Sequence, residues 1–169
     1  DQIVAIGWVV IEQGRIQIQS ARRTLVQIDG SVAKSATVHG IVDASLQDAM
    51  PLAAALNPLL QEMTRAALLA HHAPVEQRFL NAACRACFGA PLLVPIIDTV
   101  ALGRRLLERG TRSASDDALR LPALRQRYGL PAYPAHDALT DALATAELFL
   151  AQCTRLGDIG DMPLSVVQS

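Results

Sequence analysis

The sequence lacks the features of a membrane or secreted protein. No apolar run in its 169 residues approaches the length that spans a bilayer, and the first residues lack the basic start and the small-residue cleavage site of a signal peptide. Three cysteines do not make a disulfide framework, and the single C-x-x-C of Cys84 and Cys87 has no second pair at zinc spacing. These absences predict a protein of the reducing cytoplasm that has no membrane partner.

Excess charge is also absent, and lysine is almost absent. The net charge is −1, and Lys34 is the only lysine among 15 basic residues. A balanced charge is not typical of a nucleic-acid-binding protein. Arginine, however, binds phosphate through paired hydrogen bonds, so a local patch of it can do the electrostatic work. Composition therefore leaves nucleic-acid binding open.

The apolar pattern predicts a single α/β domain over 1–169, in which half of the residues are hydrophobic. A turn signal at Gln13 and Gly14 predicts an antiparallel hairpin, and β-α-β units follow it, so the expected fold is a mixed sheet flanked by helices. The predicted elements are strands over 2–11 and 15–19, an extended piece over 21–27, a helix over 45–65 that Pro58 kinks or divides, a strand over 66–70, a helix from Pro74 to near Gly89, a strand over 91–97, a helix over 98–109, a short helix over 121–128 and a last helix that begins after Asp137.

The start of the last helix carries a candidate catalytic motif. Asp137 is a candidate N-cap, Asp141 falls one turn into the helix, and His136 lies just outside it. A loop histidine and a carboxylate one turn into the next helix can converge, as a general base and a metal-bound acid do. The same residues also fit a capped helix with a surface histidine.

A second stretch, over 68–80, makes the resemblance specific. It reads as a strand, then His71 and His72, then a helix that carries Glu76 and continues Arg78-Phe79-Leu80. Together with His136 and Asp141, this stretch resembles the DnaQ-like (DEDDh) 3′–5′ exonucleases, the family of the proofreading subunit of bacterial DNA polymerase III. Their third motif is a His followed by four residues and an Asp. Their second motif has Asp where this chain has Glu76 and Asn where it has His72, and the resemblance covers nearly the whole chain.

The resemblance implies a ribonuclease H-like mixed sheet, an antiparallel hairpin plus parallel strands flanked by helices. It implies His136 as the catalytic base and Asp141 and Glu76 as metal ligands. His72 and His39, in a loop that also resembles the family, are the expected substrate-binding residues. The implied cofactor is a pair of Mg²⁺ or Mn²⁺ ions, and the implied partner is the 3′ end of single-stranded DNA or RNA.

The resemblance also predicts that the first central strand is missing. Family members begin with a strand that ends Asp-x-Glu, whereas Asp1 is followed by Gln2 and Ile3. We therefore expect the domain to be N-terminally incomplete, with an upstream segment or another chain filling the gap. We also expect weak or absent binding of the two ions here, since few carboxylates remain to hold them.

Three functions remain open at this point. The first is a metal-dependent 3′–5′ exonuclease, inactive as this fragment. The second is a degenerate exonuclease-like interaction or regulatory module without catalysis, which the replacements at Glu76 and His72 favour. The third is a hydrolase of small nucleotides on the same fold. The sequence also leaves open whether the chain forms a homodimer and whether it is joined to a fused or upstream domain.

Overall fold

The computed structural model describes residues 2–27, 48–108, 114–134 and 137–156. Its elements are strands, helices and one 3₁₀ turn: β1 Ala5–Glu12, β2 Arg15–Leu25, α2 Leu52–Met63, β3 Leu68–Ala70, α3 Ala73–Phe88, β4 Ile96–Asp98, α4 Thr99–Glu108, η3 Asp117–Leu119, α5 Leu121–Arg127 and α6 Ala138–Leu156. The fold is a mixed α/β architecture with an antiparallel hairpin and a parallel strand pair, as predicted. No described helix has both the length and the apolar character to cross a membrane.

The hairpin of β1 and β2 turns where the sequence predicted. Gln13 and Gly14 both have positive φ, 50° and 71°, which matches the right-handed twist of the strands. The predicted strand over 15–19 and the extended piece, as far as Leu25, form one continuous strand, β2. It pairs with β1 from Glu12 opposite Arg15 to Ala5 opposite Leu25. The pairing is irregular between Trp8 and Val10, which lets one long strand follow the bend of the other.

The second sheet is shorter than the sequence predicted. β3 and β4 pair in parallel over three residues each, from Leu68 opposite Ile96 to Ala70 opposite Asp98. The apolar stretches over 66–70 and 91–97 therefore extend beyond the strands. Part of the second stretch lies on the core without pairing, since Leu92 and Val94 pack against the cluster below α2.

Of the two outcomes predicted for Pro58, a kink or a division of its helix, the structure excludes the division. α2 is one helix with Pro58 inside it. Leu56 and Leu59, on either side of Pro58, are buried in a cluster with Ile6 and Trp8 of β1. Burial of this apolar face offsets the loss of the backbone hydrogen bond that proline cannot donate.

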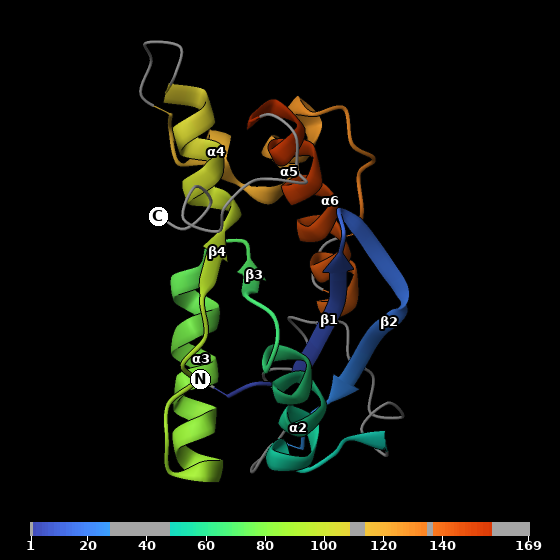
Figure 1. The fold of residues 1–169 in the computed structure, drawn as a ribbon, viewed down its shortest axis with the longest axis vertical. Coiled ribbons are helices and arrows are strands. Elements are labelled where there is room, and N and C mark those ends of the chain that lie inside the picture. Colours follow the sequence, from blue (N-terminus) through green and yellow to red (C-terminus); the bar gives the residue numbers. More distant parts are fainter. Residues whose placement is uncertain (1, 28–47, 109–113, 135–136, 157–169) are drawn as a thin grey trace.

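Helix α6 joins the two halves of the molecule (Figure 1). Its first turn touches β1 so closely that a Cβ on Gly7 would lie 2.3 Å from the carbonyl carbon of Ala138, so only glycine fits there. Further along, Phe149 packs on Ile97 and Leu102, and Leu148 packs on Leu119 and Leu124. The position of Asp141 relative to both sheets is therefore fixed by packing along the helix.

Candidate active site

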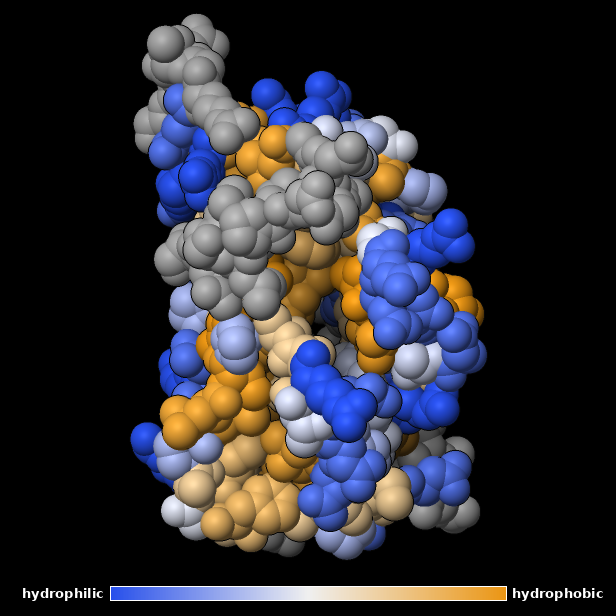
Figure 2. Space-filling view, in the orientation of Figure 1, coloured by the Kyte–Doolittle hydropathy of each residue, from blue (hydrophilic) through white to orange (hydrophobic). Residues whose placement is uncertain are grey.

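A cavity separates the two sheets. In the described part of the chain β1 pairs with β2 alone and β3 pairs with β4 alone, so the facing edges of β1 and β3 have no strand partner. The space between them has a volume of about 2040 Å³ and is lined by residues of β1, β3, α3 and α6. We call it the intersheet cavity. Figure 2 shows the molecule hollowed near its middle, with apolar side chains beside the opening.

The carboxyl ends of β3 and β4 place the start of α3 beside this cavity. Asp98 ends β4, and its Oδ1 accepts hydrogen bonds of 2.9 Å from the backbone N–H groups of Val100 and His72. Asp98 therefore caps α4, and it also holds His72, whose φ of 68° is left-handed. The two parallel strand ends thereby fix the residue at which α3 begins.

His71 and His72 have different environments. The Nδ1 of His71 lies 2.8 Å from the hydroxyl oxygen of Thr99, and burial lowers the pKa of His71 more than the nearby Asp98 raises it. His72 is exposed and borders the intersheet cavity. Thr99 is itself buried and its carbonyl accepts a hydrogen bond from Gln152 of α6. His71 therefore belongs to the polar contacts of the core.

Glu76, in the first turn of α3, is a poorly solvated carboxylate. Its Oε2 is buried and has no hydrogen-bond partner among the residues that the structure describes. Burial raises the pKa of Glu76, while its own backbone N–H and His72 oppose the increase. A buried acid without a donor takes up a proton or binds a cation.

The start of α6 contains the opposite arrangement. Oδ1 of Asp137 accepts hydrogen bonds from the backbone N–H and the hydroxyl of Thr140, at 2.9 and 3.1 Å. Its Oδ2 lies 2.8 Å from Nε of Arg23 on β2. The pKa of Asp137 is lowered, first by the N–H of Thr140. The predicted N-cap is confirmed, and it ties α6 to the hairpin.

Three of the five predicted site residues line one cavity. Glu76 and Asp141, the expected metal ligands, both line the intersheet cavity, and so does His72. His136 and His39 lie outside the described residues. The roles of all five residues remain predictions.

The acids that line this cavity fit only part of a metal site. The buried, unpartnered Oε2 of Glu76 and the carboxylate of Asp141 are oxygen donors of the type that Mg²⁺ and Mn²⁺ prefer. Yet no group of three or more His, Cys, Asp or Glu that could hold an ion occurs within residues 2–27, 48–108, 114–134 and 137–156. A complete pair of ions needs further ligands.

Sequence reasoning missed Arg125 and Glu147. Arg125 of α5 is 3 % exposed and its Nη2 lies 2.8 Å from Oε2 of Glu147 in α6. A signal was present, because Arg125 and Glu147 each follow directly after an apolar residue of an amphipathic stretch, Leu124 and Ala146. A charge on the apolar side of a helix indicates a buried partner.

Comparisons with known proteins agree with this geometry. A family model described as an exonuclease, RNase_T, matches residues 1–149. The chain is 31% identical to a PolC-type DNA polymerase III of Thermotoga maritima over 99% of this chain and 12% of the relative. It is 33% identical to a DNA polymerase III subunit epsilon-like protein of Rhodobacter capsulatus, over 89% and 21%. It is 30% identical to a putative bifunctional exonuclease/endonuclease protein of Mycobacterium tuberculosis, over 95% and 24%.

The chain spans less than a quarter of the length of each of these relatives. The family match nevertheless covers both stretches that carried the predicted motifs, over 68–80 and 136–141. Members of this family normally use divalent metal ions. The chain belongs to the RNase_T exonuclease family, the DnaQ-like family that the two motifs predicted, and its fold is of the ribonuclease H-like kind.

Proposed function

We propose that the protein carrying this chain is a metal-dependent 3′–5′ exonuclease that hydrolyses single-stranded ends of DNA or RNA in the cytoplasm. The observation that supports this most is that Glu76 and Asp141, from the two predicted motifs, line one cavity in a chain of an exonuclease family. The two acids are more than 60 residues apart in the sequence, yet both line this cavity.

In this proposal each residue has a separate task. His136 accepts the proton of the attacking water, since an imidazole with an ordinary pKa is a base near neutral pH. Glu76 and Asp141 are two of the metal ligands. Oε2 of Glu76, which has no hydrogen-bond partner in the described residues, would coordinate the cation. Bound divalent ions would supply an activated water and charge stabilisation at the leaving oxygen. His72 and His39 contact the substrate.

We also propose that an upstream segment of the same domain adds a strand between β1 and β3. Support comes from the two strand edges without partners in the described part of the chain and from the cavity between them. Such a strand would satisfy the backbone groups along both edges. It is also the place from which further carboxylates can reach Glu76 and Asp141.

The test is nuclease activity of the full-length protein on a 5′-labelled single-stranded oligonucleotide with Mn²⁺. We expect a ladder of products shortened from the 3′ end, and no ladder when the 3′ end is blocked. His136→Ala should reduce the rate about 10²–10⁴-fold, whereas the control Asp117→Asn, an exposed residue of η3, should leave it unchanged. The 169-residue chain alone should show little activity.

A second candidate is the interaction module without catalysis. The replacement of the family's Asp by Glu76, one methylene longer, favours it, because the extra length moves a ligand oxygen. Inactivity of the full-length protein on single-stranded DNA, RNA and small nucleotides would support this module and contradict the exonuclease. Activity on small nucleotides alone would identify a different hydrolase.

A further inference from the structure

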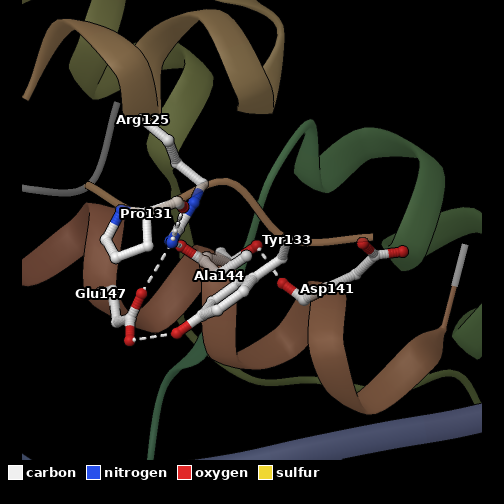
Figure 3. A network of polar contacts seen from close by, with 7 residues as sticks. Arg125, Pro131, Tyr133, Asp141, Ala144 and Glu147 are labelled. Atoms are coloured by element: carbon white, nitrogen blue, oxygen red, sulfur yellow. Dashed lines mark hydrogen bonds and ion pairs between the residues drawn. The ribbon is translucent and has the colours of Figure 1, made fainter. Parts of the chain in front are cut away.

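Arg125 contacts two other segments of the chain, residues 131–133 and helix α6 (Figure 3). Its Nη1 donates to the carbonyl of Ala144 in α6 at 2.7 Å, and its Nη2 donates to the carbonyl of Pro131 at 2.8 Å and to Oε2 of Glu147 at 2.8 Å. The guanidinium carbon lies 4.5 Å from the centre of the Tyr133 ring. The hydroxyl of Tyr133 donates to Oε1 of Glu147 at 2.9 Å. We call these five residues the Arg125 clamp.

The buried ion pair of the clamp is expected to add little to the free energy of unfolding. A buried ion pair loses its hydration, and well-packed apolar residues of the same size often stabilise a protein equally well. Nε of Arg125 is buried and has no partner among the described residues, which adds to the cost. What the planar guanidinium provides is direction, since its fixed donors orient each acceptor.

The clamp lies next to the predicted catalytic motif. Tyr133 is three residues before His136 in the sequence, and Asp137, immediately after His136, is held by Arg23 and Thr140. The chain is therefore anchored on both sides of His136. The carbonyl of Ala144 is three residues beyond Asp141, so the same arginine also holds the first turns of α6.

The side chains of the clamp and of the site point in different directions. Figure 3 shows the carboxylates of Glu147 and Asp141 on one helix, with Glu147 pointing to Arg125 and Asp141 pointing away from it. Arg125 also lines the intersheet cavity, but both of its terminal nitrogens are bonded within the clamp. If Arg125 acts through position, its removal should lower kcat, whereas a direct contact with substrate would appear in KM.

We propose that Arg125 is a positioning residue of the exonuclease site, which fixes residues 131–133 on α6 and so sets the position of Asp141 in the first turns of that helix. This inference rests on the proposed function. It differs from a purely structural role in one respect: restoring stability without the clamp should not restore the rate.

The experiment replaces the ion pair by apolar residues in the full-length protein. In Arg125→Met/Glu147→Leu we expect a melting temperature close to that of the parent. We expect kcat on the labelled oligonucleotide to fall about tenfold to a hundredfold, as small misplacements of reacting groups do, with KM within about threefold of the parent value. The control Arg127→Met, an exposed arginine of the same helix that is not part of the cavity lining, should change neither.

Two further measurements keep the proposal testable. Arg125→Lys keeps the charge but cannot orient all the acceptors, so its kcat should also fall; this variant replaces the double variant if that one does not fold. In either variant, hydrogen exchange at the backbone N–H of Asp141, which bonds to the carbonyl of Asp137 at 2.8 Å, should be faster than in the parent. Exchange at Leu69 of β3 should be unchanged.

The outcomes separate the two proposals. Recovery of kcat together with stability in the double variant would show that the clamp is only structural, and unchanged exchange at Asp141 would overturn its positioning role. A loss that appears in KM alone would also contradict it. If the parent protein degrades no nucleic acid, the proposed function fails, and the exchange measurement still decides whether the clamp orders the start of α6.

Discussion

Glu76 and Asp137 are two acids at the starts of helices α3 and α6, and their surroundings differ in every respect. Asp137 accepts two hydrogen bonds from Thr140 and pairs with Arg23, so its pKa is lowered. Glu76 keeps a buried oxygen without a partner in the described residues, and burial raises its pKa. A carboxylate with hydrogen-bond donors and a cationic partner stabilises the fold. A buried carboxylate oxygen without a donor is typical of a site that binds a cation.

The largest expected effect of this contrast is on catalysis. In the full-length protein, Glu76→Gln should reduce the Mn²⁺-dependent nuclease rate about 100-fold or more, because the amide oxygen is a weak ligand for a divalent ion. Asp137→Asn should keep the rate within a few-fold, since asparagine is also a good N-cap. Rates are compared on one labelled oligonucleotide; equal losses in both variants would remove the distinction.

A smaller effect is expected on stability, in the opposite order. Asp137→Ala loses the cap, which costs about 1–2 kcal/mol. It also loses the partly exposed pair with Arg23, worth only a few tenths to about 1 kcal/mol. Glu76→Gln should be neutral or stabilising at pH 7, because it removes a desolvated charge. Urea denaturation measures both, with Asp117→Ala as an exposed control within about 0.5 kcal/mol of the parent. A large loss in Glu76→Gln would mean that Glu76 has a structural partner.

The pH dependence of stability should differ in sign between the two acids. The folded state binds the proton of Glu76 more tightly than the unfolded state does, so the stability that Glu76 contributes falls as pH rises above about 4.3. The folded state binds the proton of Asp137 less tightly, so its contribution is lost as pH falls below about 3.9. Differences in unfolding free energy between the parent and Glu76→Gln or Asp137→Asn, measured from pH 3 to 7, give the two slopes. Slopes of the same sign would contradict the assigned environments.

The sequence identified the family, the fold class and the acids of the cavity, because these follow from local patterns. The turn signal at Gln13 and Gly14 predicted the hairpin, and the spacing of His136 and Asp141 together with the stretch over 68–80 was enough to recognise the family. The sequence could not supply the environment of each charge. Glu76 and Asp137 are both acids near helix N-termini. That Asp137 is bonded to Arg23 and Thr140, and that Oε2 of Glu76 has no partner in the described residues, is known only from the structure.

Strand length and buried ion pairs were also beyond local patterns. The apolar stretch over 91–97 reads as a strand, yet only Ile96–Asp98 pairs, because pairing needs a neighbour of matching length. Pro58 was expected to kink or divide its helix, and the helix is not divided, since packing outweighed local propensity. The contact of Arg125 with Glu147 joins residues 22 apart, which periodicity does not register.

The most direct test of the contrast is a calorimetric titration with Mn²⁺. The full-length protein should bind two ions, Glu76→Gln should bind them at least about tenfold more weakly, and Asp137→Asn should bind them as the parent does. The 169-residue chain should bind weakly, because too few carboxylates line its cavity. Unchanged affinity in Glu76→Gln, or tight binding of two ions by the 169-residue chain, would contradict the account.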